Sequence, residues 1–247
     1  MSYVFRAEGV RKCFGRHQVL TNAGFWGERG RVTVLMGSNG TGKTTLLRVA
    51  VGELLAEQGV ISFGGYVGER PRLSDLAERG LFYVPQEQLL SSYYTLSDHL
   101  RAVETRFKQD RPTDTLEALG LASLLVTRVS ELSGGERMKA SLALAVARRP
   151  TCLLIDEPFV RVAPKDQEVM ATVLRSLADA GAAVITSGHD IPILLGLCDS
   201  VIWCVAGTTH DLGAPQQALQ HSEFVREYLG PRYSGDGSRM LGAATVT

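Results

Sequence analysis

The sequence predicts an α/β fold in which helices cover a mainly parallel sheet. In the C-terminal half, short apolar stretches typical of strands alternate with helix-like segments, which is the pattern of such a sheet. The N-terminal third holds several strand signals in close succession, and a long helical stretch separates the two regions. At 247 residues, the chain is long enough to bury a substantial core.

The expected elements follow one another along the chain. The N-terminal strand signals are YVFRAEGV, RVTVLMG, GVISFGG and LFYVPQ, and the residues from about Leu96 to Arg148 are strongly helical. Beyond them we expect a strand at CLLI, a helix from about Pro164 to Ala180, a strand at AAVIT, a short helix after His189 and a strand at SVIWCV. The segment PQQALQHSEFVREYLG is expected to form one or two amphipathic helices, and residues 231–247 a flexible tail.

The composition is that of an ordinary globular protein, with 45% apolar and 21% charged residues. Lys plus Arg and Asp plus Glu number 26 each, so the overall charge does not indicate a nucleic-acid partner, and we expect none. The first residues lack the apolar segment of a secretory signal, and no stretch of about 20 apolar residues predicts a membrane span. The four cysteines lack metal-binding spacing and are expected to be reduced.

A glycine-rich motif follows the apolar strand VTVLM and precedes a helix start. It reads GSNGTGKTT and fits the pattern G-x-x-x-x-G-K-[ST]. Glycines let backbone N–H groups turn toward phosphate oxygens, and the following helix adds the positive end of its dipole. We expect phosphate binding by Gly37, Ser38, Asn39, Gly40, Thr41, Gly42, Lys43, Thr44 and Thr45. Lys43 would neutralise β- and γ-phosphate charge, and the Thr44 hydroxyl would ligate magnesium.

Two adjacent carboxylates, Asp156 and Glu157, follow the apolar run CLLI. Asp156 stands where the magnesium-holding acid of a P-loop nucleotidase is expected. Because one acid cannot easily both hold the metal and orient the attacking water, we expect Glu157 to act on the water.

A second anion-binding motif, LSGGE, opens the helix-like segment ERMKASLALAVA. The hydroxyl of Ser133 and the free backbone N–H groups of Gly134 and Gly135 would lie at a helix N-terminus, which attracts anions. Two phosphate-binding motifs in one chain suit an arrangement in which each nucleotide is sandwiched between two copies.

With these motifs the sequence resembles the ATP-binding cassette (ABC) ATPases over nearly its whole length, to about Gly230. Further family motifs occur in the expected order. Phe14 resembles the aromatic residue that stacks on adenine, Gln86 of YVPQEQ the glutamine of the glutamine loop, and His189 of TSGHD the switch histidine. LSGGE resembles the family signature, although Glu136 stands where glutamine is usual.

The resemblance implies a P-loop NTPase (RecA-like) core, an N-terminal antiparallel β subdomain and an inserted helical subdomain at about 87–148, all within a single domain of residues 1–230. It implies ATP and Mg²⁺ as cofactors, with Gln86 joining Thr44 and Asp156 at the metal. Glu157 would be the general base, His189 would contact the γ-phosphate, and Gln86 would also reach the attacking water.

The implied function is that of the ATP-hydrolysing subunit of an ABC transporter. Two cassettes, expected to be identical, would dimerise around two Mg-ATP molecules, with Ser133, Gly134 and Gly135 of one binding the γ-phosphate held by the other. A separate integral membrane protein would dock near Gln86 and the tyrosines 93 and 94, which places the chain in the cytoplasm at the inner face of the membrane. ERGLFYVPQEQLL and FVREYLG are similar to cassettes of the lipopolysaccharide-export and branched-chain amino acid types.

The segment after the two acids departs from the family pattern. Where S-G-L-D-P or A-G-V-D-P is usual, residues 160–164 read VRVAP. Ala163 replaces an aspartate that helps the two subunits sense each other's phosphate loops, and Arg161 replaces a small residue. We expect hydrolysis to be retained and its coupling between subunits to be altered. Asp166 could substitute for the missing acid only if the loop were remodelled.

Two other functions remain open: a soluble ATPase that serves no transporter, and a degenerate cassette that binds ATP and regulates a catalytic partner. Glu157 and His189 argue against the second, whereas VRVAP keeps it open. The cargo, the direction of transport, the membrane partner and the choice between identical and different subunits are not determined by the sequence.

Overall fold

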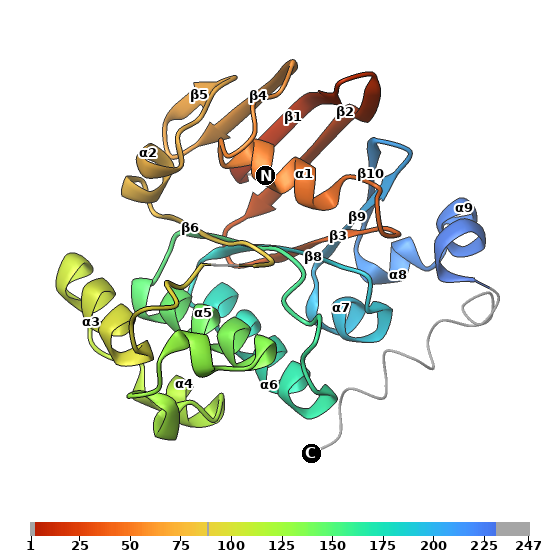
Figure 1. Cartoon of the computed structure of the whole chain (residues 1–247). Helices are drawn as coiled ribbons and strands as arrows, with labels where there is room; N and C mark the ends of the chain where they lie inside the picture. Colours follow the sequence, from red (N-terminus) through yellow and green to blue (C-terminus); the bar gives the residue numbers. More distant parts are fainter. Residues whose placement is uncertain (1–2, 88, 231–247) are drawn as a thin grey trace.

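A ten-stranded sheet runs through the protein in the computed structural model, which describes residues 3–87 and 89–230 (Figure 1). The strand order is β5-β4-β1-β2-β10-β9-β3-β8-β7-β6. The N-terminal strands and α1 lie on one side of the central strands, and α3 to α7 lie on the other (Figure 1).

The strands are β1 (Tyr3–Phe14), β2 (His17–Glu28), β3 (Val32–Met36), β4 (Gln58–Phe63), β5 (Tyr66–Gly68), β6 (Leu81–Val84), β7 (Cys152–Ile155), β8 (Ala183–Gly188), β9 (Ser200–Val205) and β10 (Thr208–Gly213). The helices are α1 (Lys43–Ala50), α2 (Leu73–Glu78), α3 (Leu96–Phe107), α4 (Thr113–Ala118), α5 (Gly134–Arg148), α6 (Pro164–Asp179), α7 (Ile191–Leu197), α8 (Pro215–Ala218) and α9 (Ser222–Phe224). Three short turns, η1 (Ala122–Leu124), η2 (Val129–Glu131) and the π-type η3 (Val225–Leu229), complete the description.

The parallel sheet expected from the sequence is confirmed. Strands β9, β3, β8, β7 and β6 pair in parallel, in that order. Every residue of β3, β7 and β8 is buried. Strands covered on both faces read as continuous apolar runs, which is why VTVLM and CLLI were recognisable in the sequence.

The N-terminal strands form the antiparallel part of the sheet, where β1 pairs with β2 and β4, and β4 pairs with β5. The sequence interpretation missed β2, β5, β10 and α2. Strand β2 reads HQVLTNAGFWGE and β10 reads TTHDLG, so neither has the apolar run or clean alternation that predicts a strand. They form strands because their backbones pair with β1 and β9, although their own residues have little preference for a strand.

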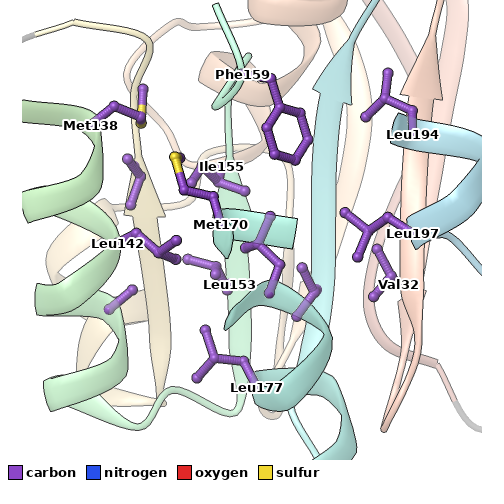
Figure 2. Packing of buried hydrophobic residues seen from close by; sticks show 14 of the residues in the cluster. Val32, Met138, Leu142, Leu153, Ile155, Phe159, Met170, Leu177, Leu194 and Leu197 are labelled. Carbon is purple, nitrogen blue, oxygen red and sulfur yellow. The ribbon is translucent and has the colours of Figure 1, made fainter. Parts of the chain in front are cut away.

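Apolar side chains fill both faces of the central strands. Alternate residues of β7 face opposite sides, so Leu153 and Ile155 pack with α5 and α6, whereas Leu154 packs on the side of α1. Figure 2 shows Met138 and Met170 among the side chains around Ile155. All four cysteines are free, and three of them are buried.

The parallel strands bring together the loops that follow four of them. Met36 pairs with Gly188, Ile155 with Thr186, and Val84 with Ile155. The residues that follow β3, β6, β7 and β8 therefore emerge at one edge of the sheet, as is usual for ligand sites in parallel α/β folds. Helices α3 to α5 lie in the chain between β6 and β7, in the range where the helical subdomain is expected. Within the described residues, no helix has the length and apolar character needed to cross a membrane.

Candidate active site

The glycine-rich loop joins β3 to α1 and depends on its glycines for shape. Gly40 and Gly42 adopt φ values of 82° and 97°, which side-chain-bearing residues rarely adopt. At Gly37 a Cβ atom would lie 2.3 Å from the carbonyl oxygen of Cys204 in β9. The loop is therefore packed tightly against the sheet at its first residue and turns sharply into α1, whose N-cap is Gly42.

The ammonium group of Lys43 lies under this loop and is almost fully buried. Its Nζ donates to the carbonyl oxygens of Gly37 at 2.7 Å and Ser38 at 3.1 Å, and lies 3.8 Å from Oε1 of Glu157. A lysine has three N–H donors, so one remains for an anionic ligand. A buried cation with a donor to spare at a helix N-terminus suits phosphate.

Asp156 is completely buried beyond the end of β7. Its Oδ1 accepts a hydrogen bond from the Ser187 hydroxyl, whereas its Oδ2 has no partner among the described residues. Burial raises the pKa of Asp156, and the Ser187 hydroxyl, which donates to Oδ1, and the nearby Thr44 hydroxyl oppose the rise. A buried carboxylate oxygen without a partner needs a ligand. With the Thr44 hydroxyl nearby, these oxygens suit Mg²⁺, which commonly takes one or two carboxylates and completes its shell with phosphate and water.

Three predicted side chains surround the carboxylate of Glu157. Gln86 Nε2 donates to Oε2 at 3.3 Å, while Lys43 Nζ and His189 Nδ1 each lie 3.8 Å from Oε1. The backbone of Glu157 has a φ of 47°, which is strained for a residue with a side chain and is often found where function requires it. The loops after β6, β7 and β8 and the start of α1 thus converge on one carboxylate.

Ser187 in β8 was missed by the sequence interpretation. Its hydroxyl donates to Asp156 and accepts a hydrogen bond from the backbone N–H of Glu157 at 3.0 Å. It therefore ties the carboxylate of Asp156 to the backbone of Glu157. The one available signal was its position two residues before His189 in TSGHD, at the end of a buried strand.

The signature residues form the N-terminus of α5. Ser133 is its N-cap: the Ser133 hydroxyl accepts from the N–H of Glu136 at 3.2 Å, and Glu136 Oε2 accepts from the N–H of Ser133 at 2.7 Å. Ser133 and Gly134 are exposed. Within the described part of the chain, no hydrogen bond joins them to the phosphate loop of the same molecule.

The two signature glycines have different surroundings. A Cβ atom added at Gly134 would meet no heavy atom within 4 Å, whereas one at Gly135 would lie 3.1 Å from the carbonyl oxygen of Arg161. Gly135 is therefore required for packing within the chain. At Gly134 there is room for a side chain, so packing within its own chain does not explain why this residue is a glycine.

Phe14 lies at the end of β1, where the hairpin turns into β2. Its ring is half-exposed, and the Lys12 ammonium lies 5.2 Å from the ring centroid. Phe14 does not take part in the contacts around Glu157. An exposed ring at a hairpin tip can stack on a base, and in this structure one face of the ring is approached by a cation of its own strand.

The departure at residues 160–164 has a defined geometry. Arg161 adopts a φ of 60° with an exposed side chain, and Ala163 is the N-cap of α6 without a capping side chain. Asp166 lies in the first turn of α6 and accepts a hydrogen bond from Lys139 of α5 at 2.9 Å. Because its carboxylate is bonded to α5, Asp166 does not replace the missing acid in this structure.

Ala163 offers a test of this loop. Its backbone is extended, as an N-cap requires, so Ala163→Ser and Ala163→Asp should each cap α6 and raise the free energy of unfolding by about 1 kcal/mol. Urea denaturation measures this gain. If the acid also couples two subunits, the aspartate variant alone should change the cooperativity of ATP hydrolysis. Equal cooperativity in Ala163→Asp, Ala163→Ser and the unsubstituted protein would mean that this loop does not tune coupling.

Two hollows border Glu157. The larger, about 780 Å³, lies between the loop after β6 and α5, and its lining includes Gln86, Leu90, Met138 and Arg161. The smaller, about 230 Å³, is lined by residues that include His189 and Gln167. The carboxylate that the predicted residues surround is thus reachable from solvent on two sides.

Comparisons with known proteins agree with this geometry. The family model described as ABC transporter matches residues 20–160. The lipopolysaccharide export system ATP-binding protein LptB of Haemophilus influenzae is 26% identical, over 93% of this chain and 98% of that protein. The Fe(3+) ions import ATP-binding protein FbpC 2 of Rhodococcus jostii is 32% identical, over 100% of this chain and 75% of that protein.

Solved structures share the fold. The crystal structure of a nucleotide-free ATP-binding cassette from an ABC transporter superposes with a TM-score of 0.78 at 22% sequence identity, and the match covers 93% of this chain and all of that one. The P-loop α/β architecture expected from the sequence is thereby confirmed.

Proposed function

The chain belongs to the ABC transporter family of ATPases, and from that premise we propose that it hydrolyses Mg-ATP at Glu157 to drive a separate membrane subunit. Its relatives are ATP-binding subunits of transport systems, and ATP hydrolysis is the activity of the family. The observation that carries the assignment to these residues is the convergence of Lys43, Gln86 and His189 on one carboxylate. The neighbouring Asp156, with a buried carboxylate oxygen that has no partner among the described residues, supports the same assignment.

Each residue has a role that follows from its chemistry. The loop from Gly37 to Thr45 binds the phosphates through backbone N–H groups, and the free N–H of Lys43 offsets their charge. Thr44, Asp156 and Gln86 would hold Mg²⁺, which would neutralise phosphate charge. Glu157 accepts a hydrogen bond from the attacking water and takes its proton, while Ser187 fixes the carboxylate of Asp156 and the backbone of Glu157. His189 contacts the γ-phosphate, and Phe14 stacks on adenine.

The complete site requires a second copy of the chain. Ser133 and Gly134 are exposed at the N-terminus of α5, where backbone N–H groups favour an anion. We propose that they bind the γ-phosphate held by an identical partner. The open space at Gly134 supports this, because a glycine in a helix costs stability and its own chain does not require it.

The membrane subunit is proposed to dock beside the larger hollow. Tyr93 is 85% exposed and Tyr94 59%, and Val126 is 81% exposed on the neighbouring segment. A backbone bond from Leu96 N–H to the Thr127 carbonyl keeps the two segments adjacent. Exposed apolar groups of this size beside a hollow are typical of a protein contact. This contact would hold the chain in the cytoplasm, at the inner face of the membrane.

Membrane capture tests the transport role. Glu157→Gln protein, purified from membranes with ATP and magnesium, should retain an integral membrane protein, because slow hydrolysis prolongs the ATP-bound state. The same variant carrying Tyr93→Ser and Tyr94→Ser should lose it. Recovery of soluble partners alone would instead favour a soluble ATPase that serves no transporter. Recovery of a second, catalytically active cassette would favour a regulatory role for this chain. Because relatives carry names from both an export and an import system, we assign no cargo.

A further inference from the structure

The hydroxyl of Tyr228 is buried and has no hydrogen-bond partner among the described residues. In that part of the chain, only two other buried side-chain polar atoms share this state, the hydroxyl of Tyr83 and Oδ2 of Asp156. A buried polar group without a partner costs free energy, so its retention calls for an explanation. For Asp156 the explanation is the proposed metal ion, whereas the mechanism above gives Tyr228 no role.

An unusual piece of backbone positions Tyr228. It lies in η3, a π-turn closed by a hydrogen bond from Gly230 N–H to the Val225 carbonyl at 2.8 Å. Such turns are rare and are frequent at functional sites. The Tyr228 ring stacks on Phe224, with 5.4 Å between ring centroids, and Phe224 packs edge-on against Trp203 at 5.6 Å.

This aromatic layer reaches the base of the phosphate loop. Trp203 of β9 pairs with Met36, the residue before Gly37, and the next residue of β9, Cys204, leaves no room for a Cβ atom at Gly37. The segment from Ser222 to Gly230 lies on the same side of the molecule as the β3–α1 loop (Figure 1).

The groups that affect the pKa of the phenol include residues of the proposed nucleotide site. Burial raises the pKa of Tyr228 to about 12, and the backbone N–H of Gly37 opposes part of the rise. Part of this rise in pKa comes from the charges of Cys204, Glu157 and Asp190. Through Phe224 and Trp203 the phenol belongs to the layer beside the first residue of the phosphate loop, and its buried oxygen has no hydrogen-bond partner among the described residues.

We propose that Tyr228 is a positioning residue for ATP binding. When the loop binds phosphate, the Tyr228 hydroxyl oxygen accepts a hydrogen bond from the backbone N–H of Gly37, and this bond fixes the start of the loop. The inference rests on the nucleotide site proposed above. It links the segment from Ser222 to Gly230 to that site, because the ring that packs on Phe224 carries the buried, unpartnered hydroxyl. Tyr228 itself touches no reacting atom.

Tyr228→Phe is the test, because it keeps the ring and removes the hydroxyl. We expect the KM for ATP, and the Kd for Mg-ADP measured by calorimetry, to rise about fivefold, the usual effect of one lost hydrogen bond. The kcat should stay within about twofold, because loop contacts act on the bound substrate and the transition state alike. The melting temperature without nucleotide should stay unchanged or rise, because a buried unpartnered group is removed.

Tyr83→Phe is the matched control. Tyr83 lies in β6, and its hydroxyl is also buried without a partner among the residues described. Its removal should leave KM and Kd unchanged. A Tyr228→Phe protein with the KM and Kd of the unsubstituted chain would overturn the inference, as would an equal change in both variants. Failure of the unsubstituted chain to hydrolyse ATP would instead refute the proposed function, so the two failures are distinguishable.

Discussion

Replacing Glu157 with glutamine is expected to lower ATP turnover by about a hundredfold to ten-thousandfold while nucleotide binding is retained. The amide has nearly the same shape and can still accept the hydrogen bond from Gln86, but it cannot take a proton from water. Removing a negative charge 3.8 Å from Lys43 also removes a competitor for the positive charge of that ammonium, so affinity for ATP should be equal or higher.

Two measurements check this expectation. Phosphate release gives the turnover, and binding of a fluorescent ATP analogue with magnesium gives the affinity. Glu168→Gln makes the same chemical change on the exposed surface of α6 and should alter neither. If Glu157→Gln kept more than a tenth of the normal turnover, the carboxylate at the centre of the cluster would not be the general base.

Sequence patterns were sufficient for the features that depend on local residues. The buried strands β3 and β7 are continuous apolar runs, so the parallel sheet could be predicted from them and from the intervening helices. The motifs after them could also be placed, because parallel strands bring their carboxyl ends to one edge. For this reason Lys43 and Glu157 lie close together although 114 positions separate them.

Features that depend on partners distant in the chain could not be predicted. Ser187 contacts the Asp156 carboxylate and the Glu157 backbone only because β7 and β8 pair in one register, and no spacing in the sequence encodes those contacts. Strand β10 is polar and depends on β9 for its hydrogen bonds. The bond from Lys139 to Asp166 likewise joins two helices whose packing is decided by the whole core. The expectation of a flexible tail at residues 231–247 lies outside the described residues.

Gly134→Ala is expected to abolish most ATP turnover without harming the fold. Gly134 is the first residue of α5, and its backbone does not require glycine. A Cβ atom there would meet nothing in its own chain, so alanine should raise the free energy of unfolding by about 0.4–1 kcal/mol. In the proposed dimer, however, the methyl group would occupy the surface that receives the partner's γ-phosphate. We expect a loss of about a hundredfold in turnover, comparable to the removal of one anion-stabilising donor.

Gly196→Ala separates the two effects. Gly196 is an exposed glycine in α7, and a Cβ atom there would also meet no heavy atom within 4 Å. Both variants should be as stable as the unsubstituted protein or more so in urea denaturation, and both should bind ATP normally as monomers, but only Gly134→Ala should lose turnover and ATP-dependent dimerisation. Gly135→Ala would not be informative, because its methyl group would press on the Arg161 carbonyl of the same chain. Normal turnover in Gly134→Ala would mean that the signature turn does not receive a partner's phosphate. A methyl group at this position meets nothing in its own chain, so a partner's phosphate is the contact that the substitution tests.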